Sequence, residues 1–139
     1  MTRVSQALRK PVIERARWRC EYCQTQQIVV IEMEIDHIVP ASAGGASTLD
    51  NLCLSCVSCN AAKSAHQTGT DPETGQNVPL FNPRRDTWAD HFAWSDDFSI
   101  LLGLTSTGRA TVERLQINDP ERVRSRRRWV EVGLHPPRD

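Results

Sequence analysis

The amino-acid sequence predicts an α+β fold in one small domain with a C-terminal extension. β-Branched residues gather between residues 26 and 39, in QQIVVIEMEIDHIV, as is typical of short strands. Segments with helix start and stop signals lie on either side, at residues 11–19 and 119–133. Cysteines cluster before and after the strand region, which suggests that its two ends are tied together. A chain of 139 residues can bury one compact core.

The first half of the chain is expected to contain a helix, a hairpin, a loop and a second helix. Pro11 suits the first position of the helix, because a first-turn residue needs no N–H donor. Residues 26–39 are expected to form both strands of the hairpin, although the position of the turn stays open. Residues 40–51 are a loop by composition. Residues 61–67, AAKSAHQ, are expected to begin the second helix.

The second half is expected to form a strand and two helices after a loop over residues 68–86. Residues 98–106 have strand character, and residues 109–118 favour a helix. In the last helix Asp119 can cap, Pro120 takes the first position and Gly133 ends the helix. We expect residues 1–69 to form one unit and residues 70–139 an extension packed on it, together one compact body. The contacts are expected to come from Trp88, His91, Phe92 and Trp94.

Composition favours a soluble protein that stays in the cytoplasm. The hydrophobic fraction is 39%, the mean hydropathy is −0.47, and no segment approaches the ~20 apolar residues of a membrane span. The basic N-terminus lacks the apolar region of a secretory signal, so the cysteines are expected to be reduced. The net charge is zero, but both ends are basic and the middle is acidic. This pattern fits either two patches for a polyanion or ordinary variation of surface charge.

The cysteines have the spacing of a structural zinc site. Cys20 and Cys23 form one C-x-x-C pair, and Cys53, Cys56 and Cys59 offer two overlapping pairs downstream. Two such pairs hold Zn²⁺ in a closed tetrahedral site without an open position for water. Cys53 lies in an apolar run, which favours Cys56 and Cys59 as the second pair, but local chemistry alone leaves the choice open.

The pattern R-x-x-C-x-x-C, D-H-I-x-P-x-x-x-G-G, N-L-x-x-x-C-x-x-C-N-x-x-K over residues 17–63 resembles the HNH endonucleases. The resemblance implies a zinc-stapled ββα-metal (His-Me) finger in which Cys20, Cys23, Cys56 and Cys59 bind zinc. It leaves Cys53 as an apolar spare. The third letter of the family motif is Asn60 here rather than His, so the chain is an H-N-N variant. Residues 78–97 and 103–118 look more loosely like the extension seen on some bacterial HNH proteins, and a bacterial or phage origin is expected.

The resemblance also implies a role for each polar residue of the motif. His37 would be the general base, Asp36 and Asn60 would hold one Mg²⁺ or Mn²⁺, and Asn51 would hold the loop that orients His37. Adjacent side chains on a regular strand face opposite ways, so the strand is expected to bend or end at Asp36 and His37. The expected activity is hydrolysis of DNA phosphodiester bonds, leaving 3′-hydroxyl and 5′-phosphate ends.

Basic side chains outside this motif are candidates for phosphate contacts. The set expected to bind nucleic acid is Lys63, Arg84, Arg85, Arg122, Arg126 and Arg127. A solvated helix face is the alternative for the arginines of residues 122–128. The alternative functions are a non-catalytic zinc module that binds nucleic acid and an RNA-cleaving nuclease. The target, the oligomeric state (monomer or homodimer) and the choice between restriction, phage packaging and repair stay open.

Overall fold

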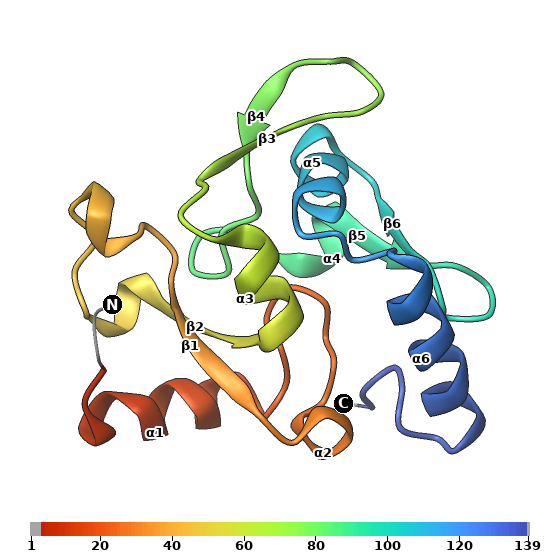
Figure 1. The fold of residues 1–139 in the computed structure, drawn as a ribbon, viewed down its shortest axis with the longest axis horizontal. Helices are drawn as coiled ribbons and strands as arrows, with labels where there is room; N and C mark the ends of the chain where they lie inside the picture. The colour runs from red at the N-terminus through yellow and green to blue at the C-terminus, as the bar shows by residue number, and fades with distance from the viewer. Residues whose placement is uncertain (1–3, 139) are drawn as a thin grey trace.

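The computed structural model describes residues 4–138, and Figure 1 shows how their helices and strands are arranged. In chain order the elements are α1 (Gln6–Arg15), α2 (Gln27–Val30), β1 (Met33–His37), η1 (Ala41–Ala43), η2 (Leu49–Asn51), β2 (Leu52–Cys56), α3 (Val57–Lys63), β3 (Thr68–Thr70), β4 (Asn77–Pro79), α4 (Trp88–His91), β5 (Phe92–Trp94), β6 (Leu101–Gly103), α5 (Ser106–Arg114) and α6 (Pro120–Glu131). The predicted α+β class is confirmed, since helices alternate with three small antiparallel strand pairs.

The central unit is the antiparallel pair β1–β2 with α3 packed on it (Figure 1). Met33 pairs with Cys56 and His37 pairs with Leu52, so the two strands are joined by the long loop 38–51. The prediction that residues 26–39 contain both strands of the hairpin is therefore wrong. Residues 27–30 form one helical turn instead, and the partner of β1 comes from the cysteine-bearing segment.

Helix α1 begins five residues earlier than Pro11, at Gln6, and Pro11 lies inside it. A proline inside a helix removes the hydrogen bond to the carbonyl four residues before it, here that of Ala7. Both Ala7 and Pro11 are exposed, so water can reach the carbonyl that lacks its usual partner. The helix buries Val12 and packs on β2. The packing of α1 on β2 stabilises the helix, which explains why α1 continues through Pro11 although proline favours the first turn of a helix.

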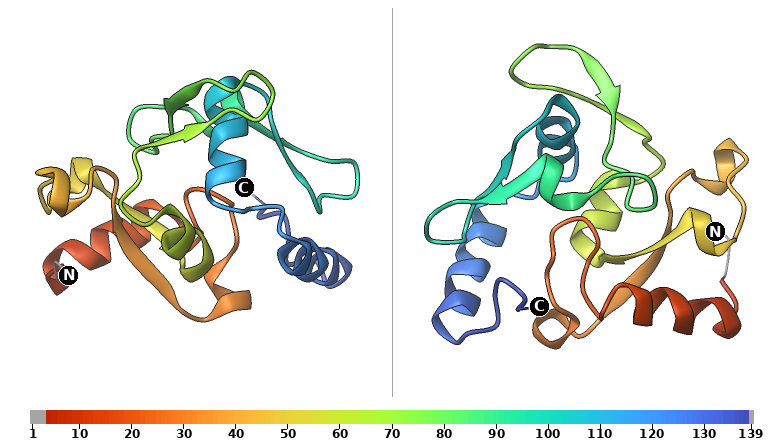
Figure 2. Two further views of the ribbon diagram at one scale, coloured as in Figure 1. Left: turned by 45° about the horizontal axis from the view of Figure 1, so that its top comes forward. Right: turned by 180° about the vertical axis from the view of Figure 1, so that it is seen from behind.

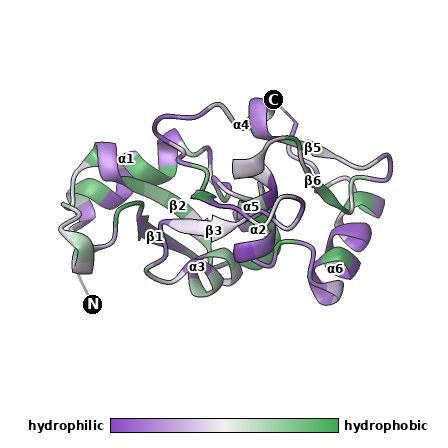
Figure 3. Cartoon of the chain, turned by 90° about the horizontal axis from the view of Figure 1, so that it is seen from above, coloured by the Kyte–Doolittle hydropathy of each residue, from purple (hydrophilic) through white to green (hydrophobic). Residues whose placement is uncertain are grey.

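The C-terminal half forms strand pairs and two helices around the central unit. The segment predicted as a loop at residues 68–86 contains the hairpin β3–β4, and β5 pairs with β6. Helix α5 packs on β6 and on β3. Helix α6 starts at Pro120 as predicted, and Gly133 beyond its end has a φ of +76°, which glycine adopts without strain. Figure 3 shows hydrophobic and hydrophilic residues side by side around α1 and α6.

One hydrophobic core joins the first half of the chain to the second. It contains Tyr22, Leu80, Phe81, Phe92 and the thiols of the cysteines. A second cluster under α1 consists of Val4, Val12, Ala16, Leu52 and Leu54. The C-terminal tail returns to the segment before α2, where Gln26 donates a hydrogen bond to the Leu134 carbonyl at 2.9 Å (Figures 1 and 2). Within residues 4–138, no helix combines the length and the apolar character needed to span a membrane.

Candidate active site and metal centre

Four cysteine thiols meet at one buried point between the turn before β1 and the start of α3. The sulfur atoms of Cys20, Cys23, Cys56 and Cys59 all lie within 4.8 Å of one another. Each pair closes a tight turn, because the Cys23 N–H donates to the Cys20 sulfur at 3.5 Å and the Cys59 N–H donates to the Cys56 sulfur at 3.4 Å. The thiols are unpaired by disulfides. The pairing left open by local chemistry is therefore Cys56 with Cys59.

The arrangement of the four sulfurs fits a tetrahedral zinc ion. Thiolates at about 2.3 Å from one Zn²⁺ lie about 3.8 Å from one another. The Cys23 and Cys56 sulfurs are 3.7 Å apart. Burial raises the pKa of the Cys20 and Cys59 thiols, whereas hydrogen bonds from the other three thiols lower the pKa of Cys23. A cation at this point would stabilise all four thiolates, and the closed ligand set makes the site structural.

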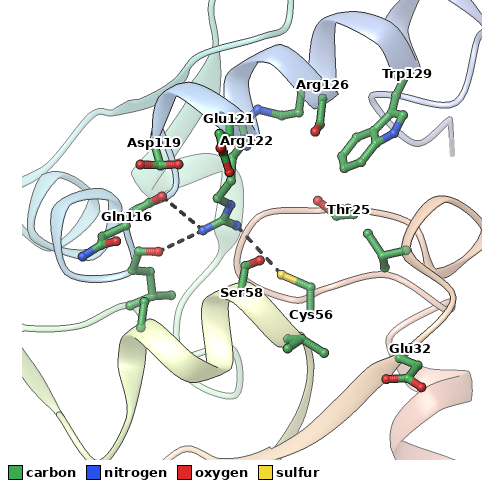
Figure 4. Close-up of a pocket in the computed structure, with 15 residues that line it drawn as sticks. Thr25, Glu32, Cys56, Ser58, Gln116, Asp119, Glu121, Arg122, Arg126 and Trp129 are labelled. Atoms are coloured by element: carbon green, nitrogen blue, oxygen red, sulfur yellow. Dashed lines mark hydrogen bonds between the residues drawn. The ribbon is translucent and has the colours of Figure 1, made fainter.

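The half-buried side chain of Arg122 in α6 contacts the thiol cluster from the pocket shown in Figure 4. Its Nη2 atom is 3.1 Å from the Cys59 sulfur and 3.9 Å from that of Cys56. Its Nη1 atom donates to the carbonyls of Leu115 at 2.9 Å and Gln116 at 3.2 Å. Burial lowers the pKa of Arg122, but the neighbouring cysteines more than offset this and raise it. The Arg122 guanidinium, which is predicted to contact nucleic acid, is thus engaged with carbonyls and thiols of the protein itself.

Cys53 stays outside the thiol cluster and belongs to a buried polar group under β1. Asp36 is its strand partner, and the Cys53 sulfur lies 3.7 Å from the Asp36 carboxylate and 3.4 Å from the Tyr22 hydroxyl. The Tyr22 hydroxyl donates to Asp36 at 2.7 Å. Burial, together with nearby acidic groups, raises the pKa of both Tyr22 and Cys53 well above their ordinary values. Both are therefore neutral donors to the one carboxylate.

Asp36 and Lys63 form a buried ion pair that links β1 to α3. The Lys63 ammonium lies 3.1 Å from the Asp36 carboxylate, and the two side chains are 2% and 6% exposed. It also donates to the carbonyls of His37 at 3.3 Å and Ile38 at 3.4 Å. Lys63 was expected to reach a phosphate. In the structure its ammonium is surrounded by three acceptors at the end of β1.

His37 is the last residue of β1, and its half-buried ring is held by the loop that follows. Its Nε2 atom lies 2.8 Å from the Ser47 hydroxyl. The strand ends at His37, one of the two alternatives expected for this position. Side-chain alternation still places Asp36 and His37 on opposite faces of β1. Asp36 points to α3, whereas Met33 and Ile35, which share the face of His37, pack with residues of α1.

Asn51 fastens the loop between β1 and β2 with its side-chain amide. Its Oδ1 atom accepts from the Val39 N–H at 2.9 Å, and its Nδ2 atom donates to the carbonyls of Val39 at 3.0 Å and Ala46 at 2.9 Å. Gly45 is needed here, because a Cβ atom at this position would lie 1.7 Å from the Val39 carbonyl oxygen. These bonds set the conformation of the segment that carries Ser47, the partner of His37.

Asn60 lies in the first turn of α3 and contacts a carboxylate that the sequence pattern did not single out. Its Nδ2 atom donates to Glu34 at 2.9 Å. This bond leaves the Asn60 Oδ1 atom as an acceptor with no partner among residues 4–138. Glu34 could have been found from the period-2 alternation of β1, because it lies two residues before Asp36 and faces the same helix.

An open groove of about 1050 Å³ brings the polar residues of β1 and α3 together. Glu34, Asp36, His37 and Asn60 all line it. Asn51 lies outside the groove lining and acts on the loop behind it. His66, six residues after Asn60, is exposed, lies 3.5 Å from Arg114 and does not line the groove.

Of the remaining arginines expected to bind nucleic acid, two form hydrogen bonds or ion pairs within the protein and two are exposed to solvent. Arg84 forms an ion pair with Glu21. Arg126 is buried, donates to the Ser99 and Ile117 carbonyls at 2.7 Å each, and has its pKa lowered by burial to about 10. Both guanidinium groups therefore bind groups of the protein itself.

Two arginines of the same set keep their side chains in solvent. Arg85 is exposed, and Arg127 is 60% exposed with Asp97 at 3.8 Å. His91, one of the residues expected to pack against the first half, contacts the Thr105 hydroxyl at 2.7 Å. Trp88 packs against the first half as expected, and its indole N–H donates to the Tyr22 carbonyl at 2.9 Å.

A comparison with models of known protein families found a match over the segment that contains the thiol cluster. Residues 20–66 match the family model described as HNH endonuclease. This span begins at the first cysteine of the thiol cluster and ends just after α3. No match to a curated protein was found. The matched segment thus contains the complete thiol cluster together with Glu34, Asp36, His37 and Asn60 of the groove, and residues 20–66 are similar to an HNH endonuclease domain.

Proposed function

We propose that the protein is a metal-dependent endonuclease that hydrolyses DNA phosphodiester bonds in the groove beside β1. One observation carries the proposal. His37, Asp36 and Asn60 come from two elements and line a single groove within the segment that matches the HNH family. A base and oxygen donors around one open groove are what hydrolysis of a phosphodiester requires.

The groove has the donor set of a hard divalent cation. The Asn60 Oδ1 atom is unpartnered among residues 4–138, and the Glu34 and Asp36 carboxylates lie on the same face. Asn60 and Asp36 are the proposed ligands of Mg²⁺ or Mn²⁺, which tolerates few protein ligands and several waters. When bound, such a cation supplies positive charge for the phosphate and the departing oxygen. Asp36 would share its carboxylate between the cation and Lys63.

His37 is the proposed general base. Its imidazole accepts a proton from the attacking water as the water oxygen bonds to phosphorus and the bond to the 3′ oxygen breaks. The products carry a 3′-hydroxyl and a 5′-phosphate. Ser47 fixes the ring through its contact with Nε2, and Asn51 fixes the loop that carries Ser47. The thiol cluster supports this arrangement, because Cys56 ends β2 and Cys59 lies one residue before Asn60.

The test is nicking of supercoiled plasmid DNA by wild type and by His37→Ala, with Mg²⁺ or Mn²⁺ added. His66→Ala is the matched control, since His66 is an exposed histidine outside the groove. Metal-dependent nicking by wild type and His66→Ala, but not by His37→Ala, supports the proposal. Zinc content is measured for all three proteins, so that a folding defect is not mistaken for lost chemistry.

The other outcomes point to the alternative functions. A zinc-loaded wild type that binds DNA and never cuts it would identify a nucleic-acid-binding module. Cleavage of an RNA strand with no cleavage of the matching DNA strand would identify a ribonuclease. One chain has one such groove among its described residues, so a monomer is expected to nick, and double-strand cleavage requires two chains or two events.

A further inference from the structure

The groove follows the free edge of β1, with α1 on one side and α3 on the other. Among residues 4–138, β1 pairs only with β2, and the seven consecutive residues 31–37 line the groove along its open edge. Residues 60, 64 and 65 contribute from α3 and its end, and residues 4 and 9 contribute from the α1 side. A nucleic-acid strand lying along this edge therefore has both helices within reach.

Arg9 of α1 is on the side of the groove where His37 lies. Side chains alternate along β1, so His37 shares a face with Met33 and Ile35. These two residues pack against the hydrophobic cluster under α1. Glu34 and Asp36 face the other way and contact α3. The proposed base and Arg9 thus lie on one side, and the proposed metal ligands lie on the other.

Arg9 is also the only lysine or arginine among the described residues that line the groove. The lining carries three carboxylates, those of Glu32, Glu34 and Asp36. Its charge is therefore unfavourable for a phosphodiester unless cations are supplied. A divalent ion on the α3 side would offset the carboxylates there, but among the described residues that line the groove on the side of His37 the only cation is Arg9.

The guanidinium of Arg9 is available for a ligand. It is half-exposed, and within residues 4–138 it has no hydrogen-bond or ion-pair partner. By contrast, Lys63, Arg84, Arg122 and Arg126 are engaged with acidic groups, thiols or carbonyls of the protein itself. An unpaired arginine in an acidic groove is suited to a bidentate contact with a phosphate.

We propose that Arg9 binds a phosphate of the substrate strand and holds it on the side of the groove where His37 acts. This inference rests on the proposed nuclease function. It gives Arg9 the phosphate contact that the sequence analysis predicted for Lys63. It also gives α1 a part in catalysis, although α1 lies outside the residues that match the HNH family.

The experiment compares wild type with Arg9→Gln, Arg9→Lys and Lys10→Gln in the full chain. Lys10→Gln is the matched control, because it removes one positive charge from the next position of the same helix, where Lys10 faces solvent 4.0 Å from Glu14. Binding to a labelled DNA duplex is measured over a series of salt concentrations without added divalent metal. Cleavage of the same duplex is then measured with Mg²⁺, and zinc content and circular dichroism verify the fold.

Arg9→Gln is expected to reduce the slope of log K against log salt by about one unit, since one phosphate contact is lost. It is expected to lower kcat/KM for cleavage about tenfold to a hundredfold. Arg9→Lys should recover part of both effects, because it keeps the charge and loses the bidentate geometry. Lys10→Gln should cleave at the wild-type rate.

Two results would overturn the inference while leaving the nuclease proposal intact. The first is wild-type cleavage and an unchanged salt slope in Arg9→Gln. The second is an equal loss in Lys10→Gln, which would indicate a general effect of net charge. A wild type that binds DNA without cutting it would reject the nuclease activity, and the salt slope would still decide whether Arg9 contacts phosphate. A wild type that neither binds nor cuts would reject both proposals.

Discussion

The Nη2 atom of Arg122 lies 3.1 Å from the sulfur of Cys59, so the last helix of the chain contacts the thiol cluster directly. The same guanidinium is anchored by the carbonyls of Leu115 and Gln116, between α5 and α6. Four thiolates around Zn²⁺ carry a net charge of about −2, and a buried cation beside them offsets part of it. The C-terminal extension therefore contacts the thiol cluster even though all four of its cysteines come from the first half of the chain.

Arg122→Gln is expected to release zinc faster than wild type. Loss of a charged hydrogen bond to a thiolate weakens the site by about 1.5–3 kcal/mol, which corresponds to roughly tenfold or more in affinity. Transfer of zinc to a chromogenic chelator measures the rate. Arg124→Gln is the control, because Arg124 lies on the exposed side of α6. Equal release rates in wild type and Arg122→Gln would show that the contact does not stabilise the metal.

The thiol cluster could be predicted from the sequence because its geometry is largely local. Each pair is held by an N–H donor from the second cysteine to the sulfur of the first, within three residues. The polar motif residues follow from the resemblance for a similar reason, since they lie close to the cysteines along the chain. The helix over residues 120–131 was also predictable, as Pro120 and Gly133 set its ends.

The partners of the basic side chains could not be predicted from the sequence, because these partners lie on segments that are distant along the chain. Lys63 meets Asp36 only when α3 packs on β1, and Arg126 reaches the Ser99 carbonyl across the fold. The hairpin was misplaced for the same reason. The β-branched run of residues 28–31 has strand propensity, but tertiary context gives it a helical turn. The partner of β1 is β2, which comes after the loop 38–51, and no local sequence pattern predicts the register in which the two strands pair.

Lys63→Met is expected to destabilise the fold strongly. The substitution leaves the Asp36 carboxylate buried without its ion-pair partner, which should lower the free energy of unfolding by about 3–5 kcal/mol. The double variant Lys63→Met with Asp36→Asn should recover part of this loss, because the uncompensated charge is removed as well. Urea denaturation of the two single variants and the double variant completes the cycle. Additive losses in the double variant would show that the two side chains are not coupled.

His135 should make the protein less stable in mild acid. Its ring packs edge-on against Trp94 at 4.5 Å, its Nε2–H donates to the Phe98 carbonyl, and its Nδ1 atom is buried without a partner among the residues that the structure describes. Burial, followed by the positive charge of Arg126, lowers the pKa of His135 from 6.5 to about 4. Between these values the unfolded chain binds a proton that the folded chain does not. The stability contributed by the neutral ring is therefore complete above about pH 6.5 and is lost as the pH falls towards 4.

The check is thermal unfolding of wild type, His135→Gln and His66→Gln at about pH 7 and about pH 5. His135→Gln should lose less stability than wild type between the two pH values, since glutamine does not titrate and can still donate to Phe98. His66→Gln should behave like wild type, because His66 is exposed. The same pH dependence in all three proteins would place the acid sensitivity elsewhere.

Gly45→Ala should impair cleavage without loss of zinc. The added Cβ atom would lie 1.7 Å from the Val39 carbonyl oxygen and 2.9 Å from the Asn51 amide nitrogen, so the loop behind His37 has to move. A displacement of about 1 Å in a catalytic group can reduce the rate about a hundredfold.

Gly75→Ala is the control for this prediction. It strains the backbone at a φ of +76°, but its added Cβ atom would meet no other atom within 4 Å, and Gly75 does not line the groove. Nicking at the wild-type rate by zinc-loaded Gly45→Ala would show that the Asn51-bound loop does not position the base. Equal losses in both variants would instead point to a general loss of stability, since only Gly45 lies against the loop that carries Ser47.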